Sequence, residues 1–183
     1  GMDIAKDGPR MAAKRFSNGL FFVADVYQRL LLPENSVHTL LNIFAPRNAA
    51  EFARVLKPKG QLIVVIPNDA HLAELRNRFD LLTIQSGKEN QVIEQMVDVD
   101  LILTHSERLA FEMMLAPDAL LSLLHMTPNH RHQLDYVNAN ESSERAHDPK
   151  LSKPVDLTVS AMSKFTNTTA SFKILTFEPR SAT

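Results

Sequence analysis

The stretch LKPKGQLIVVIP, residues 56–67, decides more about the fold than any other part of this chain. Residues 61–67 form a nearly continuous apolar run that lacks the polar–apolar alternation of a half-exposed strand. Such a run is typical of a parallel strand that is covered on both faces. Before it, residues 47–60 carry apolar positions at helical spacing and end in Pro-Lys-Gly. The stretch therefore predicts a helix followed by a buried parallel strand, the repeating unit of α/β sheets.

Further elements extend this pattern in both directions along the chain. Short apolar runs predict strands at 20–25 (LFFVAD) and 37–46 (VHTLLNIFAP). Helical spacing and helix-forming residues predict helices over 9–16, 70–79, 106–115 and 117–126. Near the end, VDLTVSAMS (155–163) and SFKILTF (171–177) flank KFTNTTA and predict an antiparallel hairpin. The fold class that follows is α/β, with a mostly parallel sheet and an antiparallel C-terminal hairpin.

The composition limits the classes of function. The net charge of −1 gives no global field that attracts nucleic acid, so any RNA-binding surface has to be local. The absence of cysteine excludes disulfides, thiolate zinc sites and a cysteine nucleophile. No apolar run approaches the ~20 residues that span a membrane. We also see no signal segment, and we therefore expect a cytoplasmic protein with no membrane partner.

Polar and aromatic residues follow three of the predicted strands. In open α/β sheets, ligands bind beyond the carboxyl ends of the strands. Asp3 follows a short apolar step, and Asp25 ends LFFVAD; a carboxylate there can accept ribose hydroxyls or an adenine amino group. The stretch NIFAP (42–46) could hold a flat base beside a methyl donor. The alternative is plainer: such acids also cap helices and stabilise turns, and Phe44 could be a core residue.

Taken in order, these stretches resemble the class I S-adenosylmethionine-dependent methyltransferases. More narrowly, they are similar to the bacterial large-subunit rRNA (guanine-N1)-methyltransferases. The segments that carry the resemblance are GMDIAK, AAKRF, FFVADVYQRLLLPENSV, NIFAP, EFARVLKPKGQLIVVIPNDAHLAEL and LLHMTP. They cover 1–79 almost continuously and return at 120–128. The resemblance implies a Rossmann-like methyltransferase sheet.

The resemblance also implies roles for the matching positions. The implied cofactor-binding residues, for S-adenosylmethionine, are Asp3, Ile4, Asp25, Val26, Asn42 and Ala45. The implied catalytic residues, which border the methyl group and the target guanine, are Asn42, Phe44 and Pro46. The implied substrate-side residues are His71, Met126, Thr127 and Pro128.

The reaction implied is in-line transfer of the cofactor's methyl group to guanine N1 of large-subunit rRNA. Since the sulfonium is already a strong electrophile, the protein mainly orients the reactants and removes water. Guanine N1 has to lose a proton, and Asp69 and His71 are the candidate bases. In this interpretation the chain is one partial domain. Its parts are a cofactor side (1–79), a helical substrate side (80–137), a mobile polar loop (138–154) and the hairpin (155–183).

The family carries more sequence in front of GMDIAK, namely a zinc module, a first strand and a glycine-rich loop that wraps the cofactor. This chain has five glycines and no Gly-x-Gly step, so we expect weak cofactor binding and weak or no activity from the chain alone. The family's first strand lies between the strand that ends at Asp3 and the one that ends at Pro46. We therefore expect an N-terminally truncated sheet that is rearranged or completed in an intertwined homo-oligomer.

Three alternatives stay open at this point. The chain could be a non-catalytic module, derived from a methyltransferase, that serves binding or oligomerisation. It could also be a small-molecule methyltransferase of the same fold. The third is a metal site at His125, His130 and His132, with Asp135 as the one nearby acid. Because two of these histidines are only two residues apart, a solvated loop is the better interpretation, and we expect no metal.

Overall fold

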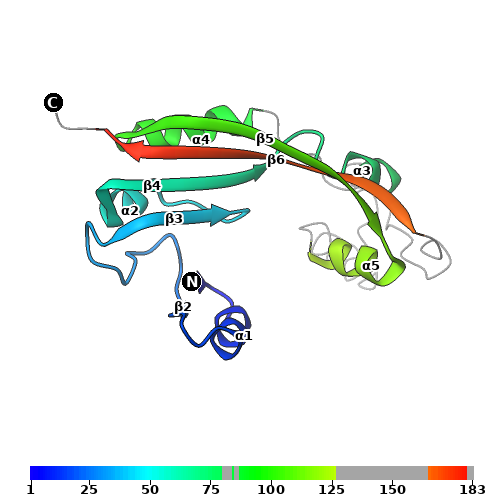
Figure 1. Ribbon diagram of the computed structural model, residues 1–183, viewed down its shortest axis with the longest axis horizontal. Coiled ribbons are helices and arrows are strands. Elements are labelled where there is room, and N and C mark those ends of the chain that lie inside the picture. Colours follow the sequence, from blue (N-terminus) through cyan, green and yellow to red (C-terminus); the bar gives the residue numbers. More distant parts are fainter. Residues whose placement is uncertain (80–83, 85–86, 127–164, 181–183) are drawn as a thin grey trace, which may run out of the picture. The chain divides into compact units, whose positions relative to one another are not determined.

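The computed structural model describes residues 1–79, 84, 87–126 and 165–180 (Figure 1). The chain divides into two compact units. The first comprises Gly1–Ile66, Gly87–Glu107 and Lys173–Thr183, and the second comprises Pro67–Ser86 and Arg108–Phe172. None of the helices in the described part of the chain combines the length and the apolar character needed to cross a membrane.

The strands form two separate sheets. In the smaller sheet, β1 (Met2–Asp3) pairs in parallel with β2 (Phe22–Val23). The larger sheet has the order β3-β4-β6-β5, built from β3 (Val37–Ile43), β4 (Leu56–Pro67), β6 (Thr166–Pro179) and β5 (Leu101–Leu115). β3 and β4 are parallel, and the β6 arrow runs against both of its neighbours in Figure 1. The mixed α/β sheet agrees with the predicted fold class.

The division of the strands into two separate sheets agrees with the expectation of an interrupted sheet. β1 pairs only with β2, and β3 pairs only with β4, so the strand ending at Asp3 is not bonded to the strand ending before Pro46. The chain therefore does not close the sheet by joining these two strands. One edge of β1 and one edge of β3 have no strand partner in the part of the chain that is described.

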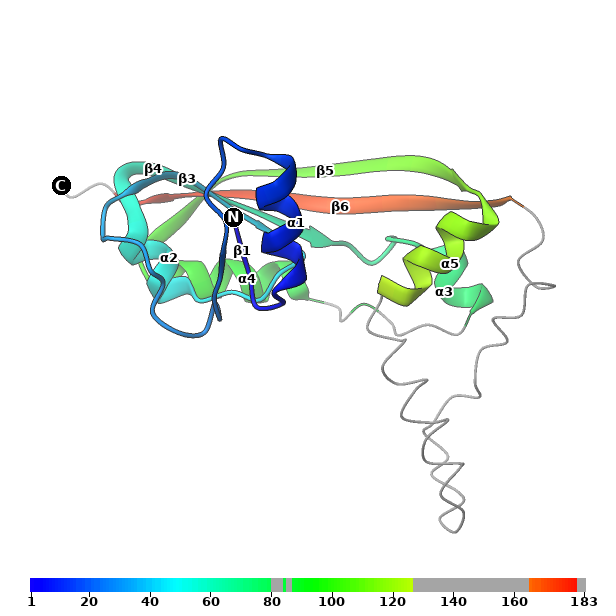
Figure 2. The ribbon, with the colours of Figure 1, turned by 90° about the horizontal axis from the view of Figure 1, so that it is seen from below.

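Two helices of the first unit cover one face of the larger sheet, α2 (Ala49–Val55) and α4 (Lys88–Val97), as Figure 2 shows. Their apolar residues pack on the strands in one core, whose fully buried members include Val55, Leu62, Val64, Val92, Met96, Leu175 and Phe177. On β4 the even positions 62, 64 and 66 are buried, while the odd positions 61, 63 and 65 are half-buried. The sequence predicted cover on both faces of this strand; one face is fully covered and the other is covered in part. On the other face Leu41 and Ile43 of β3 lie 61% and 53% exposed.

The turn between α2 and β4 is tighter than the sequence predicted. Helix α2 ends at Val55 and the strand begins at once with Leu56, so Pro58, Lys59 and Gly60 belong to the strand rather than to a connecting turn. The pairing of β3 with β4 shifts register between Val37 and Thr39, opposite this segment. A Cβ on Gly60 would lie 2.9 Å from the carbonyl oxygen of His38. Only glycine fits this close approach of two backbones.

The second unit has its own core. It contains α3 (Ala73–Arg78) and α5 (Pro117–Met126) together with the adjoining parts of β5 and β6. Its buried apolar residues come from both helices and their flanks, namely Leu72, Leu75, Phe79, Leu120 and Leu124. The helix predicted over 117–126 is confirmed, and the one predicted over 70–79 is the shorter α3.

The prediction of a helix over 106–115 is wrong, because these residues continue β5 through Leu115. Glu, Leu, Ala and Met favour a helix locally, but pairing with β6 overrides that weak preference. The hairpin is also corrected, since Thr166–Ala170 lie inside β6 and not in a turn. Its first arm, 155–163, lies outside the described residues, as does the polar loop 138–154. Helix α1 (Asp7–Arg15) matches the first predicted helix, while β2 is shorter than expected.

Candidate functional site

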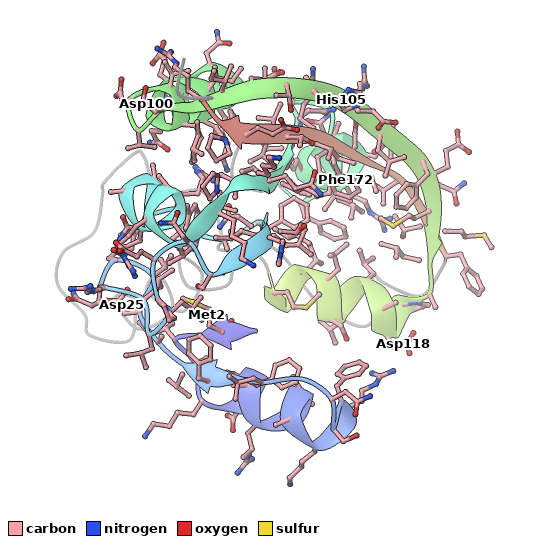
Figure 3. All side chains as sticks on the ribbon, turned by 60° about the vertical axis from the view of Figure 1, so that its left-hand side comes forward. Met2, Asp25, Asp100, His105, Asp118 and Phe172 are labelled. Atoms are coloured by element: carbon pink, nitrogen blue, oxygen red, sulfur yellow. The ribbon has the colours of Figure 1, made fainter. Side chains whose placement is uncertain are left out.

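The C-terminal ends of the strands in the first unit carry the candidate site. β1 ends at Asp3, Asp25 lies two residues beyond β2, and the turn that contains Phe44 follows β3 directly. Figure 3 marks Met2 on β1 and Asp25 in the loop after β2. β1 is parallel to β2, and β3 is parallel to β4, so within each pair the C-terminal ends lie at one edge, and such edges are where α/β sheets bind ligands.

The two carboxylates have similar local roles. Asp3 accepts the N–H of Ala5 at 2.8 Å through Oδ1, and Asp25 accepts the N–H of Tyr27 at 2.9 Å through Oδ1. These bonds are the side-chain turns that the plainer interpretation predicted. The second oxygen of each carboxylate has no bond among the described residues. Each aspartate therefore stabilises a turn and keeps one acceptor oxygen.

The turn after β3 holds an aromatic residue in an unfavourable backbone conformation. Phe44 has φ of +50° and its ring is 54% exposed, while its N–H donates to the carbonyl of Val65 at 3.1 Å. A side chain in the left-handed region is strained, and such strain clusters at functional sites. Since Phe44 is more than half exposed, the interpretation as a core residue is wrong. Ala45 is half-buried and Pro46 is exposed beside it.

The side chain of Asn42 stabilises this turn. Its side chain is 5% exposed, and Nδ2 donates to the carbonyl of Pro46 at 2.9 Å. Its Oδ1 is buried and has no hydrogen-bond partner in the described part of the chain. A buried acceptor without a donor costs about 1–3 kcal/mol, so this oxygen is a place where a ligand N–H could be accepted.

The loop after β2 is fixed to α2. Asn48 caps α2 by accepting the N–H of Glu51, and its Nδ2 donates to the carbonyl of Val26 at 3.0 Å. The side chain of Val26 packs against the core, whereas Ile4 near Asp3 is 69% exposed. The backbone of this loop is therefore held in place beside the candidate site.

Two cations that the sequence analysis did not single out also lie in the first unit. Arg47 directly follows Pro46, and burial lowers the pKa of its guanidinium. Lys88 is the first residue of α4, and burial, followed by the charge of Arg47, lowers the pKa of its ammonium. Sequence patterns give no signal for this pair because 41 positions separate the two residues along the chain (88 minus 47).

The predicted substrate-side residues belong to the second unit. His71 accepts the N–H of Ser171 through Nδ1 at 3.2 Å, and its ring lies 4.8 Å from that of Phe172. Burial, and next the charge of Arg76, lowers the pKa of His71, which favours the neutral imidazole. Met126 ends α5 and is 77% exposed. Thr127 and Pro128 lie outside the described residues.

In the described ranges of the chain, no group of three or more His, Asp or Glu side chains is placed to hold a metal ion. His130, His132 and Asp135 lie outside these ranges, as does the side chain of His125, so the interpretation of HMTPNHRH as a solvated loop stays a prediction.

With this geometry in place, comparison with known proteins gives a consistent result. A 23S rRNA (guanine(748)-N(1))-methyltransferase of Streptomyces fradiae is 37% identical over 132 residues, which is 72% of this chain and 47% of that protein. The chain resembles the bacterial 23S rRNA (guanine-N1)-methyltransferases. YxjB of Bacillus subtilis, which carries the same class name, is 34% identical over 128 residues, 70% of this chain and 45% of its own length. The chain thus spans about half the length of these relatives. No family model matches.

Solved structures agree on the fold. An S-adenosylmethionine-dependent methyltransferase of Methanosarcina mazei superposes with a TM-score of 0.54 at 12% identity, covering 99% of this chain and 82% of that one. The fold is the Rossmann-like fold of these methyltransferases. The resemblance stated from the sequence is confirmed for both the class and the fold.

Proposed function

We propose that the protein to which this chain belongs transfers a methyl group from S-adenosylmethionine to N1 of a guanine in large-subunit rRNA. The observation that carries the proposal is the turn after β3, which holds the exposed, strained Phe44. Two residues earlier, the buried Oδ1 of Asn42 has no hydrogen-bond partner among the described residues. An aromatic face and a buried acceptor suit a flat base that offers N–H donors. The relatives' names support guanine N1 as the target.

Several residues of this chain are chemically suited to bind parts of S-adenosylmethionine. Asp3 keeps one carboxylate oxygen for a ribose hydroxyl, and Asp25 keeps one for an adenine amino group. We propose that Ile4, Val26 and Ala45 make the apolar contacts with the bound cofactor. S-adenosylmethionine supplies an electrophilic methyl group when bound, so the task of these side chains is to orient it and to exclude water.

We keep His71 as a proposed substrate contact. Its Nδ1 accepts a hydrogen bond from the N–H of Ser171, and its lowered pKa favours the neutral ring. Exposed Asp69 is the proposed group that takes the guanine N1 proton. Met126, Thr127 and Pro128 remain proposed substrate contacts. We also propose that the reaction takes place in the cytoplasm.

We further propose that the unpaired edges of β1 and β3 are completed in a homo-oligomer. Strand edges with exposed apolar side chains pair readily with other strands. Leu41 and Ile43 on β3, and Val23 on β2, are exposed apolar residues in the two sheets.

Calorimetric titration of the chain with S-adenosylhomocysteine tests the cofactor site. We expect weak but measurable binding in the high micromolar range, reduced tenfold or more in Asp3→Ala. Asp7→Ala is the matched control, because Asp7 is an exposed carboxylate on α1 whose ion pair with Arg10 faces solvent. Loss of binding in both variants, or no heat at millimolar ligand with the wild-type chain, would contradict the proposed cofactor site.

A further inference from the structure

Three exposed cations follow one another at four-residue spacing along helix α1, and we call Lys6, Arg10 and Lys14 the basic stripe. Lys6 is the N-cap and has helical backbone angles, and the N–H of Arg10 donates to its carbonyl at 3.3 Å. Residues four apart lie on the same face of a helix, about 6 Å from each other along its axis. The less exposed Pro9 and Ala12 lie on another face of α1. Figure 3 shows nitrogen-tipped side chains that project from α1 on the side away from β1 and β2.

The described carboxylates leave most of this positive charge uncompensated. Arg10 forms an ion pair with Asp7 at 3.3 Å, but the two side chains are 69% and 81% exposed, so solvent screens the pair. Lys6 and Lys14 form no ion pair with any carboxylate in the part of the chain that the structure describes. The stripe therefore presents its cations to solvent, where an external anion can reach them.

The stability of the helix does not explain the stripe. The N-cap position favours Ser, Thr, Asp or Asn, whose side chain accepts a backbone N–H, but Lys6 makes no such bond. A positive charge at this end also opposes the helix dipole, whereas Lys14 in the last turn is favourable. Like charges four residues apart repel each other, so Arg10 is disfavoured between the two lysines. A polyanion along the stripe offsets this repulsion.

The location of the stripe connects it with the candidate site. Lys6 lies three residues after Asp3, and Oδ1 of Asp3 holds the N–H of Ala5 directly before it. Helix α1 contacts both β1 and β2, the strands that lead to Asp3 and Asp25. Cations spaced evenly along a line suit the evenly spaced phosphates of a nucleic-acid strand, whereas a compact anion needs donors that converge. Because the net charge is −1, attraction of RNA depends on a local group of cations such as this one.

We propose that the basic stripe of α1 binds the phosphate backbone of the rRNA strand that carries the target guanine. This inference rests on the proposed function, because it assigns an RNA contact to the helix beside the proposed cofactor site. Lys6 and Lys14 each contact a phosphate as a point charge, and Arg10 exchanges its exposed pair with Asp7 for a phosphate. The contact positions the strand and reads no sequence.

Fluorescence anisotropy with a labelled single-stranded RNA of about 12 nucleotides, at several salt concentrations, tests the proposal with the whole chain. We expect Lys6→Gln/Lys14→Gln to weaken binding roughly tenfold and to reduce the log–log salt slope by about 1.4, because each phosphate contact contributes about 0.7. Lys6→Arg/Lys14→Arg keeps both charges and should bind like the wild-type chain. Lys59→Gln/Arg180→Gln is the charge-matched control, because it removes two exposed cations on β4 and directly after β6, and it should keep the wild-type slope.

The melting temperature shows whether the variants fold. It should stay the same or rise in Lys6→Gln/Lys14→Gln, because less repulsion between like charges remains on α1. Wild-type affinity and slope in that variant, an equal loss in the control, or no RNA binding by the wild-type chain would each overturn the proposal. Binding to phosphatidylserine vesicles in place of RNA would also overturn it, since the stripe would then serve a membrane surface. Failure of the proposed function shows separately, as absent S-adenosylhomocysteine binding with the RNA effects intact.

Discussion

At the scale of single residues, backbone conformation and burial together separate functional from structural positions. Phe44 and Leu72 share a left-handed φ, +50° and +53°. Leu72 is 7% exposed and belongs to the core of the second unit, so its strain is offset by packing. Phe44 is 54% exposed and has no such compensation from burial. Its side chain is therefore the better candidate for contact with a ligand.

We predict opposite effects for glycine at these two positions. Phe44→Gly should leave the free energy of unfolding unchanged or raise it by up to about 1 kcal/mol, because glycine removes the left-handed strain. Leu72→Gly should lower it by about 3 kcal/mol, because a buried side chain is lost. Urea denaturation of both variants measures the difference. An equal loss in the two would show that Phe44 is a packing residue.

At the scale of elements, β3 has one edge without a strand partner among the described residues. The N–H of Phe44 bonds to Val65 on β4. Since alternate residues of a strand in a parallel pair point their backbone groups to opposite sides, the groups of Leu41 and Ile43 point to the open edge. Their side chains also lie on the face that α2 and α4 do not cover. β3 thus combines unpaired backbone groups with an exposed apolar face.

We predict that this strand drives self-association. Light scattering after gel filtration should give a mass above the 20.5 kDa of one chain for the wild type and a monomer for Ile43→Lys. Met11→Lys is the control, because Met11 is 68% exposed on helix α1 rather than on a strand. If the wild-type chain is a monomer at tens of micromolar, a second copy of the chain does not pair with the open edge of β3.

At the scale of the whole molecule, each unit contains one carboxylate that is held strongly in its charged form. In the first unit, hydrogen bonds from Arg54 and from the N–H of Leu30 lower the pKa of Glu51 to about 2. In the second, the pKa of Glu74 is lowered to about 2 by its own N–H, the N–H of Thr169 and the hydroxyl of Thr168. These contacts connect Glu51 to the loop before β3 and Glu74 to β6.

We predict that acid destabilises both units through these groups. Each folded pKa lies below the ordinary value of 4.5, so the stability it contributes is present above pH 4.5 and is lost as the pH falls toward 2. The urea midpoint of the wild-type chain should therefore drop between pH 5 and pH 2. Glu51→Gln and Glu74→Gln should each lower the midpoint at pH 7 and flatten this dependence. If the urea midpoint of the wild-type chain is constant over this pH range, the ionised forms of Glu51 and Glu74 do not stabilise the fold.

The sequence by itself determined the class of fold and the order of the helices and strands up to β4. The apolar run at 61–67, the strand before Phe44 and the acids after β1 and β2 are signals between residues close together in the chain, and they carried the resemblance to the methyltransferases. The tertiary structure alone decided three further features. These are the strand at 106–115, the uncovered face of β3, and the burial that lowers the pKa of Arg47 and of Lys88. All three depend on contacts between residues far apart in sequence, where partner strands override local propensity and burial sets the cost of a charge.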